Sequence, residues 1–265
     1  MYIFMQGTLR LFLTVALAHL LGDFPLQSSR LAAQKLRHWW GHCWHGGIHL
    51  VVLLLALRIF IPSQPWSNGR LLAGIAAYIA AHTLIDLARQ QVIKRGIPVG
   101  STSIFLADQA LHLATIIALT VFLTEANWQV LRSQLTVPSA TRDLLLSGGV
   151  VYAAVVFAGG YLIRSMTRGL LGGVSVRLGE SVEQLTNAGL YIGWLERLLV
   201  VTAVVLHSPA LIGLILTAKS IARFPEMKES KFAEYFLIGT LLSVSIALLG
   251  GLVLLKLWYG AVSLQ

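Results

Sequence analysis

The sequence predicts an all-α fold: a polytopic membrane helix bundle of about eight spanning helices in two four-helix halves. Of the 265 residues, 56% are hydrophobic and only 12% are charged, and the mean hydropathy is +0.76. This is more apolar material than a soluble core of this size needs. The apolar residues also fall into stretches of about 20, the length that crosses a bilayer as a helix.

The apolar stretches place helices at 5–24, 41–62, 71–91, 103–124, 145–165, 187–207, 209–223 and 232–257. The first stretch lacks a basic leading region and a small-residue cleavage site, so we interpret it as a retained helix rather than a signal peptide. Pro209 has no backbone N–H and separates the sixth and seventh helices, either as a tight hairpin or as a kink. Residues 170–188 are too polar to span, and we expect a surface helix or loop there.

This pattern divides the chain into three parts. Residues 1–124 form a first four-helix half, residues 125–144 an extracytoplasmic linker, and residues 145–265 a second helical half. Lys and Arg are enriched after the first, third, fifth and seventh helices, which makes those four loops cytoplasmic and both termini extracytoplasmic. The net charge of +9 therefore reflects topology and contact with the lipid bilayer, and we expect no nucleic-acid partner.

Histidines and aspartates gather in the first half at helical spacing. His19 and Asp23, His82 and Asp86, and Asp108 and His112 are three pairs four residues apart, so each pair shares one helical face. The second helix adds His42, His45 and His49, and Gln27 lies four residues after Asp23. All of these positions are predicted to lie at the cytoplasmic ends of their helices.

Ionisable groups inside a membrane cost at least about 2.5 kcal/mol each, so a cluster of this size needs partners, water or a metal. Imidazole and carboxylate ligands together suit a divalent ion, with zinc preferred and iron or manganese as alternatives. The metal-free alternative is a proton relay or a structural hydrogen-bond network. The predicted ligand pool is His19, Asp23, His45, His49, His82, Asp86 and His112.

Two further residues receive catalytic or positioning roles. Asp108 is assigned as general base or as an orienting group, and Gln27 as a residue that positions the substrate. His38, His207 and one histidine of the second helix are interpreted as packing residues. Cys43 is left out of the ligand set, because a lone buried thiol usually packs as a small hydrophobe.

The second half contributes a separate polar set. Lys219 and Arg223 lie four residues apart and could bind a phosphate or carboxylate together with Glu196. The alternative is that both cations anchor the chain at lipid head groups or pair with Glu196 and Glu234. Arg197 and Lys231 are interpreted as such anchors.

Four sequence motifs carry a family resemblance. The stretches HLLGDFPLQ (19–27), IGWLERLL (192–199), TAKSIARF (217–224) and EYFLIGTLLS (234–243) resemble an uncharacterised bacterial membrane family, the domain-of-unknown-function 3307 family. The resemblance implies an integral protein of the bacterial inner membrane. It implies no activity and no catalytic residues.

The residues therefore have to indicate the function. We expect a membrane-embedded, metal-dependent hydrolase acting on an amphipathic, anionic small molecule at the cytoplasmic leaflet, where a metal would activate water. The rivals are a proton- or ion-coupled transporter, a di-iron oxidase or hydroxylase, and a scaffold in which the cluster only packs. A homo-oligomer is left open. Phosphate-loop, H-E-x-x-H and G-x-S-x-G motifs do not occur in the sequence.

Overall fold

The computed structural model describes residues 7–62, 67–96, 98, 101–125, 141–171, 181–228 and 230–259. All regular secondary structure in these residues is helical, which confirms the predicted all-α class. The chain forms two compact units, Met1–Val150 and Val151–Gln265, and each is described by itself. Most of the predicted linker, residues 126–140, lies outside the described residues.

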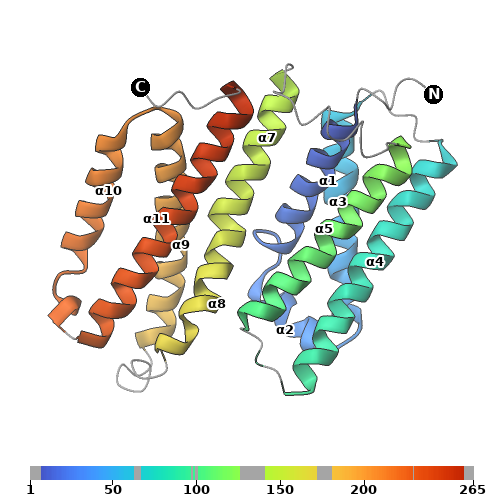
Figure 1. The fold of residues 1–265 in the computed structure, drawn as a ribbon. Coiled ribbons are helices and arrows are strands. Elements are labelled where there is room, and N and C mark those ends of the chain that lie inside the picture. The colour runs from blue at the N-terminus through green and yellow to red at the C-terminus, as the bar shows by residue number, and fades with distance from the viewer. Residues whose placement is uncertain are drawn as a thin grey trace. The chain divides into compact units, whose positions relative to one another are not determined.

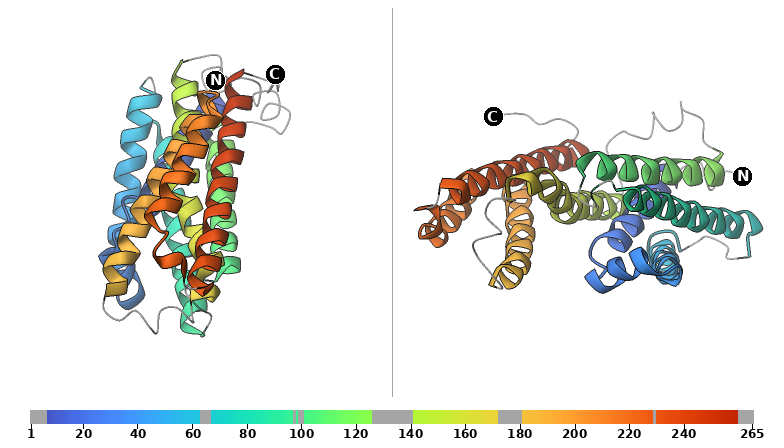
Figure 2. Two further views of the ribbon diagram at one scale, coloured as in Figure 1. Left: turned by 90° about the vertical axis from the view of Figure 1, so that its left-hand side faces the viewer. Right: turned by 90° about the horizontal axis from the view of Figure 1, so that it is seen from below.

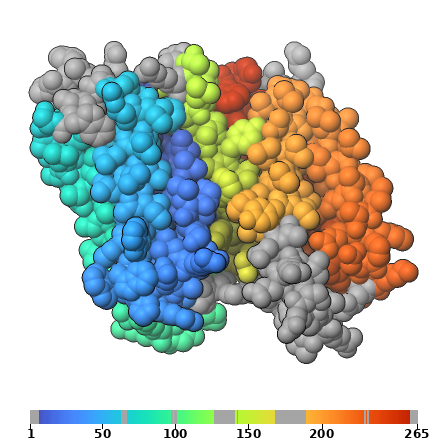
Figure 3. All heavy atoms as spheres, turned by 180° about the vertical axis from the view of Figure 1, so that it is seen from behind, coloured from blue at the N-terminus to red at the C-terminus, as the bar shows by residue number. Residues whose placement is uncertain are grey.

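Unit 1 is a closed four-helix bundle with a short helix at one end (Figure 1). Its helices are α1 (Thr8–Asp23), α2 (Ser29–Arg37), α3 (Trp40–Phe60), α4 (Gly69–Lys94) and α5 (Thr102–Thr124). Helix α1 packs against α3 and α5, and α4 packs against the same two helices. Helix α2 packs against α3, and in the space-filling view from behind it forms the blue surface at the lower end of this unit (Figure 3).

Side chains at the helix starts explain two of the boundaries. The Ser28 hydroxyl accepts a hydrogen bond from the backbone N–H of Leu31 at 3.2 Å, which caps α2. The side-chain oxygen of Asn68 accepts hydrogen bonds from the backbone N–H groups of Arg70 and Leu71, which caps α4. Hydropathy does not predict α2, because its nine residues are too polar and too few to span a membrane.

The apolar core of unit 1 fills the end of the bundle opposite α2. It consists of buried residues from the four long helices, among them Val15, Leu53, Leu71, Ile75 and Leu119. On α1 the buried apolar residues end at Ala18, and the buried His19 follows directly. Each long helix of this bundle thus has an apolar part and a polar part, and the polar parts are at the same end.

Unit 2 contains the rest of one long helix and three more helices. Helix α7 (Thr141–Ala153) continues through a π-helical turn, η2 (Ala154–Ala158), into α8 (Gly159–Leu171). It is followed by α9 (Ser181–Val205), α10 (Pro209–Ala222), the 3-10 turn η3 (Glu226–Lys228) and α11 (Ser230–Tyr259). Helix α11 packs against α8 and α9, and α9 packs against α10 and η2, with the helices of the unit running alongside one another (Figure 2).

The Pro209 break is a hairpin between separate helices. Pro209 occupies the first turn of α10, where its missing N–H is tolerated, and His207 has a left-handed backbone with φ of 53°. Helices α9 and α10 pack against each other, so the chain reverses direction here. The kinked-helix alternative is thereby excluded.

The prediction of eight spans is wrong. Within the described residues, five helices are long and apolar enough to cross a membrane: α3, α4, α5, Asp143–Thr167 and Phe232–Tyr259. Helices α1 and α10 have 16 and 14 residues, so at 1.5 Å per residue they reach about 24 and 21 Å, short of a core of about 30 Å. Helix α9 opens on the polar sequence SVEQLTN. Five apolar helices are typical of an integral membrane protein, while the membrane side of each end stays a prediction.

Candidate metal centre

Histidines and aspartates from four helices meet at the α2 end of unit 1. They come from the last turns of α1, the first turns of α3, the C-terminal half of α4 and the first turns of α5. Spacings of three and four residues place the side chains of each helix on one face, and that face points into the bundle. Seven of the predicted site residues are buried here: His19, His45, His49, His82, Asp86, Asp108 and His112.

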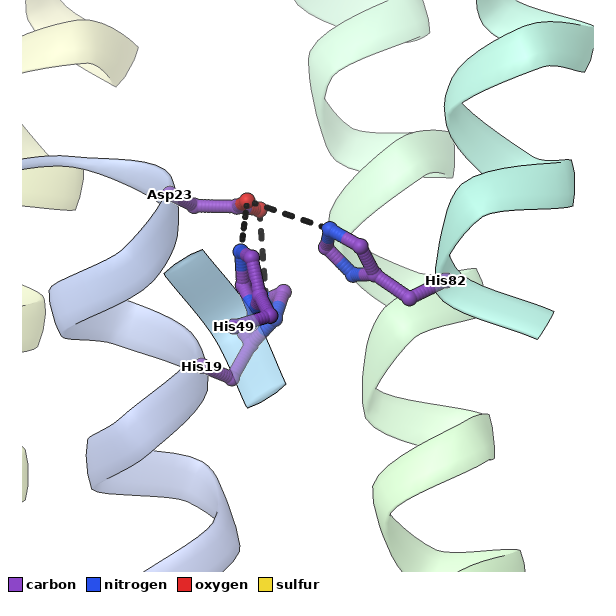
Figure 4. Close-up of side chains that lie close together, drawn as sticks. All are labelled: His19, Asp23, His49 and His82. Carbon is purple, nitrogen blue, oxygen red and sulfur yellow. Dashed lines mark hydrogen bonds and ion pairs between the residues drawn. The ribbon is translucent and has the colours of Figure 1, made fainter. Parts of the chain in front are cut away.

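Asp23 lies at the centre of this group (Figure 4). Its Oδ1 accepts hydrogen bonds from Nε2 of His45 and Nε2 of His49, both at 3.0 Å. The same oxygen lies 3.6 Å from His82 Nε2, and Oδ2 lies 3.5 Å from His19 Nε2. Four imidazoles on three helices therefore direct the same nitrogen, Nε2, toward one carboxylate.

A row of histidines continues from Asp23 across the bundle. His45 Nε2 and His82 Nε2 are 3.2 Å apart, and His82 Nδ1 and His112 Nδ1 are 3.1 Å apart. The ring centroids of His49 and His82 are 3.9 Å apart, compared with 4.3 Å for His82 and His112. The row runs from α3 through α4 to α5, which is across the helices rather than along them.

Asp86 is paired with a lysine from the short helix. Lys35 Nζ on α2 lies 2.6 Å from Asp86 Oδ2 and donates a hydrogen bond to Gln27 Oε1 at 2.9 Å. Asp86 Oδ2 also lies 3.5 Å from His45 Nε2. Gln27 thus reaches the cluster through Lys35, and α2 supplies a cation to it.

Asp108 has a similar cationic neighbour. Its Oδ2 accepts hydrogen bonds from Arg89 Nη1 at 3.4 Å and from Gln109 Nε2 at 3.2 Å. Its Oδ1 lies 3.7 Å from His112 Nε2. Of the three carboxylates, Asp86 and Asp108 each have a Lys or Arg partner, whereas the described contacts of Asp23 are all to histidines.

Three groups of donors in this cluster have ligand atoms close enough to share a metal ion. They are His19, Asp23, His49 and His82; His45, His82 and Asp86; and Asp86, Asp108 and His112, with the ligand atoms of each group within 4.8 Å of one another. Buried atoms without a hydrogen-bond partner among the described residues include His19 Nδ1, His45 Nδ1, Asp108 Oδ1 and His112 Nε2. Imidazole nitrogens and carboxylate oxygens are ligands that a divalent metal binds, and several of them here make no hydrogen bond that would compete with a metal.

Other residues of the same region have structural contacts. His42 Nε2 lies 3.1 Å from the Lys35 carbonyl and 3.2 Å from Gln90 Oε1, and it belongs to none of the three groups. Gln90 Nε2 donates to the same Lys35 carbonyl at 2.6 Å and holds the end of α2. His38 stacks on Trp40, and Cys43 is exposed.

The predicted anion-binding residues lie in unit 2 and have partners of their own. Lys219 Nζ donates to Glu196 Oε2 at 2.6 Å and lies over the Phe236 ring. Arg223 Nη1 lies 3.4 Å from Glu226 Oε1. These pairs match the ion-pair alternative for Lys219 and Glu196. Whether Lys219, Arg223 and Glu196 bind substrate stays a prediction.

Three charged residues have larger structural roles than their sequence context indicated. Lys35 and Arg89, which belong to the Lys- and Arg-rich segments after the first and third predicted helices, contact the cluster, and Arg197 is 4% exposed rather than a surface anchor. A signal for Lys35 exists: it lies four residues after Leu31, the buried residue of α2, and so shares its face.

Comparison with known proteins assigns the first half of the chain to a family. A family model described as "Protein of unknown function (DUF3307)" matches residues 11–137, which include every residue of the His/Asp cluster. No curated protein and no solved structure matches the chain. The motifs at 192–199, 217–224 and 234–243 lie outside the matched range. Residues 11–137 are a domain of the DUF3307 family.

Proposed function

We propose that the cluster of unit 1 is the metal centre of a membrane-embedded hydrolase that acts on an amphipathic substrate at the cytoplasmic leaflet. The observation that carries this proposal is the convergence of His19, His49 and His82 on Asp23 (Figure 4). A catalytic zinc site uses nitrogen and oxygen ligands of this kind and keeps one coordination position for water or substrate. When bound there, a divalent ion would lower the pKa of a water ligand and polarise a carbonyl or phosphoryl oxygen.

The charged neighbours favour the group of His19, Asp23, His49 and His82 over the other two groups of possible metal ligands. Lys35 and Arg89 already neutralise Asp86 and Asp108, so a divalent cation bound beside those carboxylates would meet two positive side chains. Asp23 has no such neighbour among the described residues. We therefore assign His19, Asp23, His49 and His82 as ligands. His45, Asp86 and His112 form hydrogen bonds and ion pairs around them.

Asp108 is the candidate general base. Its Oδ1 is buried and accepts no hydrogen bond in the described structure, with His112 Nε2 at 3.7 Å, while Arg89 and Gln109 hold Oδ2 and fix the carboxylate plane. A carboxylate held in this way can accept a proton from a water molecule on its free oxygen. Gln27, held by Lys35 at the same end of the bundle, is assigned to substrate positioning.

An apolar groove next to the cluster supports an amphipathic substrate. A groove of about 660 Å³ between α3 and α4 is lined by apolar side chains and Thr83. Two of its lining residues, Leu50 and Thr83, directly follow His49 and His82 in the chain. This end of the groove therefore lies at the same level along α3 and α4 as the proposed ligands, whose side chains point into the bundle. A substrate with an apolar chain in this groove would have its polar part at that level.

The arrangement favours an enzyme over a transporter. A relay across the membrane needs polar groups along its whole depth. Here the histidine row runs between helices at one end, and the buried apolar residues of unit 1 fill the other end. A di-iron oxidase is the competing enzyme for the same geometry. The identity of the bound metal would distinguish it from a hydrolase.

Elemental analysis of the detergent-purified full chain tests the metal centre. We expect about one zinc per chain in the wild type, a loss of most of it in Asp23→Asn, and no change in His38→Asn, which alters a histidine outside the cluster. Stoichiometric iron with an optical signature would assign the oxidase. Less than a tenth of an ion per chain after incubation with zinc, iron or manganese would refute a metal centre.

Hydrolysis is tested separately on the zinc-loaded protein in micelles. The probes are 4-methylumbelliferyl palmitate for esters and octyl p-nitrophenyl phosphate for phosphodiesters. We expect one probe to be cleaved, and we expect 1,10-phenanthroline and Asp108→Asn each to lower the rate at least a hundredfold. A rate that survives removal of the metal would contradict the proposal.

A further inference from the structure

Three exposed tryptophans lie at the α2 end of unit 1. Trp39, Trp40 and Trp44 follow the junction of α2 and α3 and are 76%, 37% and 66% exposed. Trp40 and Trp44 are four residues apart and share the outward face of α3, while the buried His45 and His49 point to the other side, into the bundle. Tryptophan is highly buried on average in folded proteins, so three neighbouring exposed indoles indicate a surface that contacts something.

Two exposed cations lie on the outward face of α2. Arg30 and Arg37 are seven residues apart, close to two helical turns, so they share one face. The buried Leu31 and Lys35, which pairs with Asp86, occupy the other side of the helix. Helix α2 therefore has one side docked on the bundle and one cationic side exposed.

The end of α4 adds two more cations at this end of the bundle. Gln90 Nε2 donates to the Lys35 carbonyl of α2 at 2.6 Å, so this part of α4 lies beside α2. Lys94 follows Gln90 by one turn, Arg95 caps the helix, and both are exposed. Neither these two cations nor the two arginines of α2 form an ion pair with a described residue.

No exposed carboxylate balances this charge among the described residues at the α2 end. Asp23, Asp86 and Asp108 belong to the cluster, and even the most accessible of them has a side chain only 11% exposed. The other two described carboxylates of unit 1 pair with Arg70 and Arg10, at the starts of α4 and α1, which is the opposite end of the bundle. We refer to the exposed residues at this end as the α2 surface: Arg30, Arg37, Trp39, Trp40, Trp44, Lys94 and Arg95.

We propose that the α2 surface binds the head groups of anionic phospholipids at the membrane interface. Indoles prefer this depth, because the ring is apolar and the N–H is polar. Arginine and lysine side chains are attracted to anionic lipids at the same depth. The surface also includes the first turn of α3 and the last turn of α4, two helices apolar enough to cross a membrane. The proposal concerns residues outside the cluster and does not rest on the metal centre.

The single cysteine allows the depth of this surface to be measured in the otherwise unchanged chain. Cys43 is exposed and lies on α3 between Trp40 and Trp44. A nitroxide attached to it is studied by electron paramagnetic resonance in vesicles of equal parts phosphatidylcholine and phosphatidylglycerol. We expect the accessibilities to oxygen and to a water-soluble nickel chelate to report head-group depth. A label fully exposed to water would refute the proposal, and so would a label shielded from both reagents, which indicates a second copy or another protein on this surface.

Two double variants test the preference for anionic lipid. A fluorophore on Cys43 follows titrations with dioctanoyl phosphatidylglycerol and, as the zwitterionic probe, dioctanoyl phosphatidylcholine, in a neutral detergent. Each cation at an anionic lipid surface strengthens binding about fivefold, so Arg30→Gln/Arg37→Gln should bind phosphatidylglycerol roughly 25-fold more weakly. Arg58→Gln/Lys256→Gln removes the same charge from two exposed positions outside the α2 surface and should bind like the wild type. Equal affinity of the wild type for both lipids, or equal affinity of the two double variants for phosphatidylglycerol, would overturn the proposal.

Discussion

Gly22 gives a test of the metal centre that leaves every ligand in place. It precedes Asp23 on α1, and a Cβ at this position would lie 2.6 Å from both Cε1 and Nε2 of the His49 ring. The ring has little room to move, since its centroid is 3.9 Å from that of His82 and 4.6 Å from that of His45. Gly22→Ala therefore displaces the His49 imidazole from Asp23 without changing the donor set.

The expected magnitude follows from two effects of opposite sign. Inserting a methyl group into a packed interior costs about 1–3 kcal/mol, and replacing a helical glycine by alanine gains up to about 1 kcal/mol. The metal-free variant should thus be about 0–3 kcal/mol less stable than the wild type. Misplacing a ligand typically lowers metal affinity about 10- to 100-fold, which corresponds to roughly 1.4–2.7 kcal/mol of binding free energy.

The assay compares zinc titrations and unfolding temperatures, with and without zinc, in the wild type, Gly22→Ala and Gly47→Ala. Gly47 is the matched control on α3, because a Cβ there meets nothing within 4 Å. We expect Gly47→Ala to bind zinc like the wild type and to be slightly more stable. Wild-type zinc affinity in Gly22→Ala would show that His49 and Asp23 do not share a metal ion, and the ligand assignment would be refuted.

Two further predictions concern the lysine of α2 and the helix packing of unit 2. Lys35→Met removes the cation that pairs with Asp86 at 2.6 Å, so the metal-free protein should lose about 3–5 kcal/mol of stability. Zinc binding should tighten or rise above one ion per chain. Unchanged zinc binding by elemental analysis would contradict the charge argument. Gly250→Ala places a methyl group against Val155 on η2, and we expect it to lower the stability of the full chain by about 1–3 kcal/mol in thermal unfolding, whereas Gly239→Ala, which meets nothing within 4 Å, should not destabilise it.

The positions of the helices could be predicted from the sequence because each long helix contains a long apolar stretch. All eight predicted ranges overlap a helix, from 5–24 on α1 to 232–257 on α11. The number of spans could not be predicted in the same way, since hydropathy finds apolar stretches but does not fix where helices end. Helix α1 ends at Asp23 and α10 ends at Ala222, so both are shorter than a membrane span.

The pairing of the polar residues depends on tertiary structure. Spacings of four residues predict that His19 and Asp23 share a face, and likewise His82 and Asp86. They do not predict that Asp23 receives His45 and His49 from α3 in preference to its own helical neighbour, at 3.0 Å against 3.5 Å. That preference arises from the packing of α1 on α3, which brings the end of one helix against the start of the other.

The charged residues show most clearly why a sequence of this class underdetermines its sites. In a chain of apolar helices, Lys and Arg near loops follow the positive-inside pattern, and Lys35 and Arg89 fit it, whereas Arg197 lies within α9. The fold gives the three different roles: Lys35 and Arg89 face carboxylates, and Arg197 faces two carbonyls and a hydroxyl. Two carboxylates of unit 1 thus have a cation, and one carboxylate, Asp23, contacts only imidazoles among the described residues. Asp23 is therefore the carboxylate beside which a metal ion would be stabilised most.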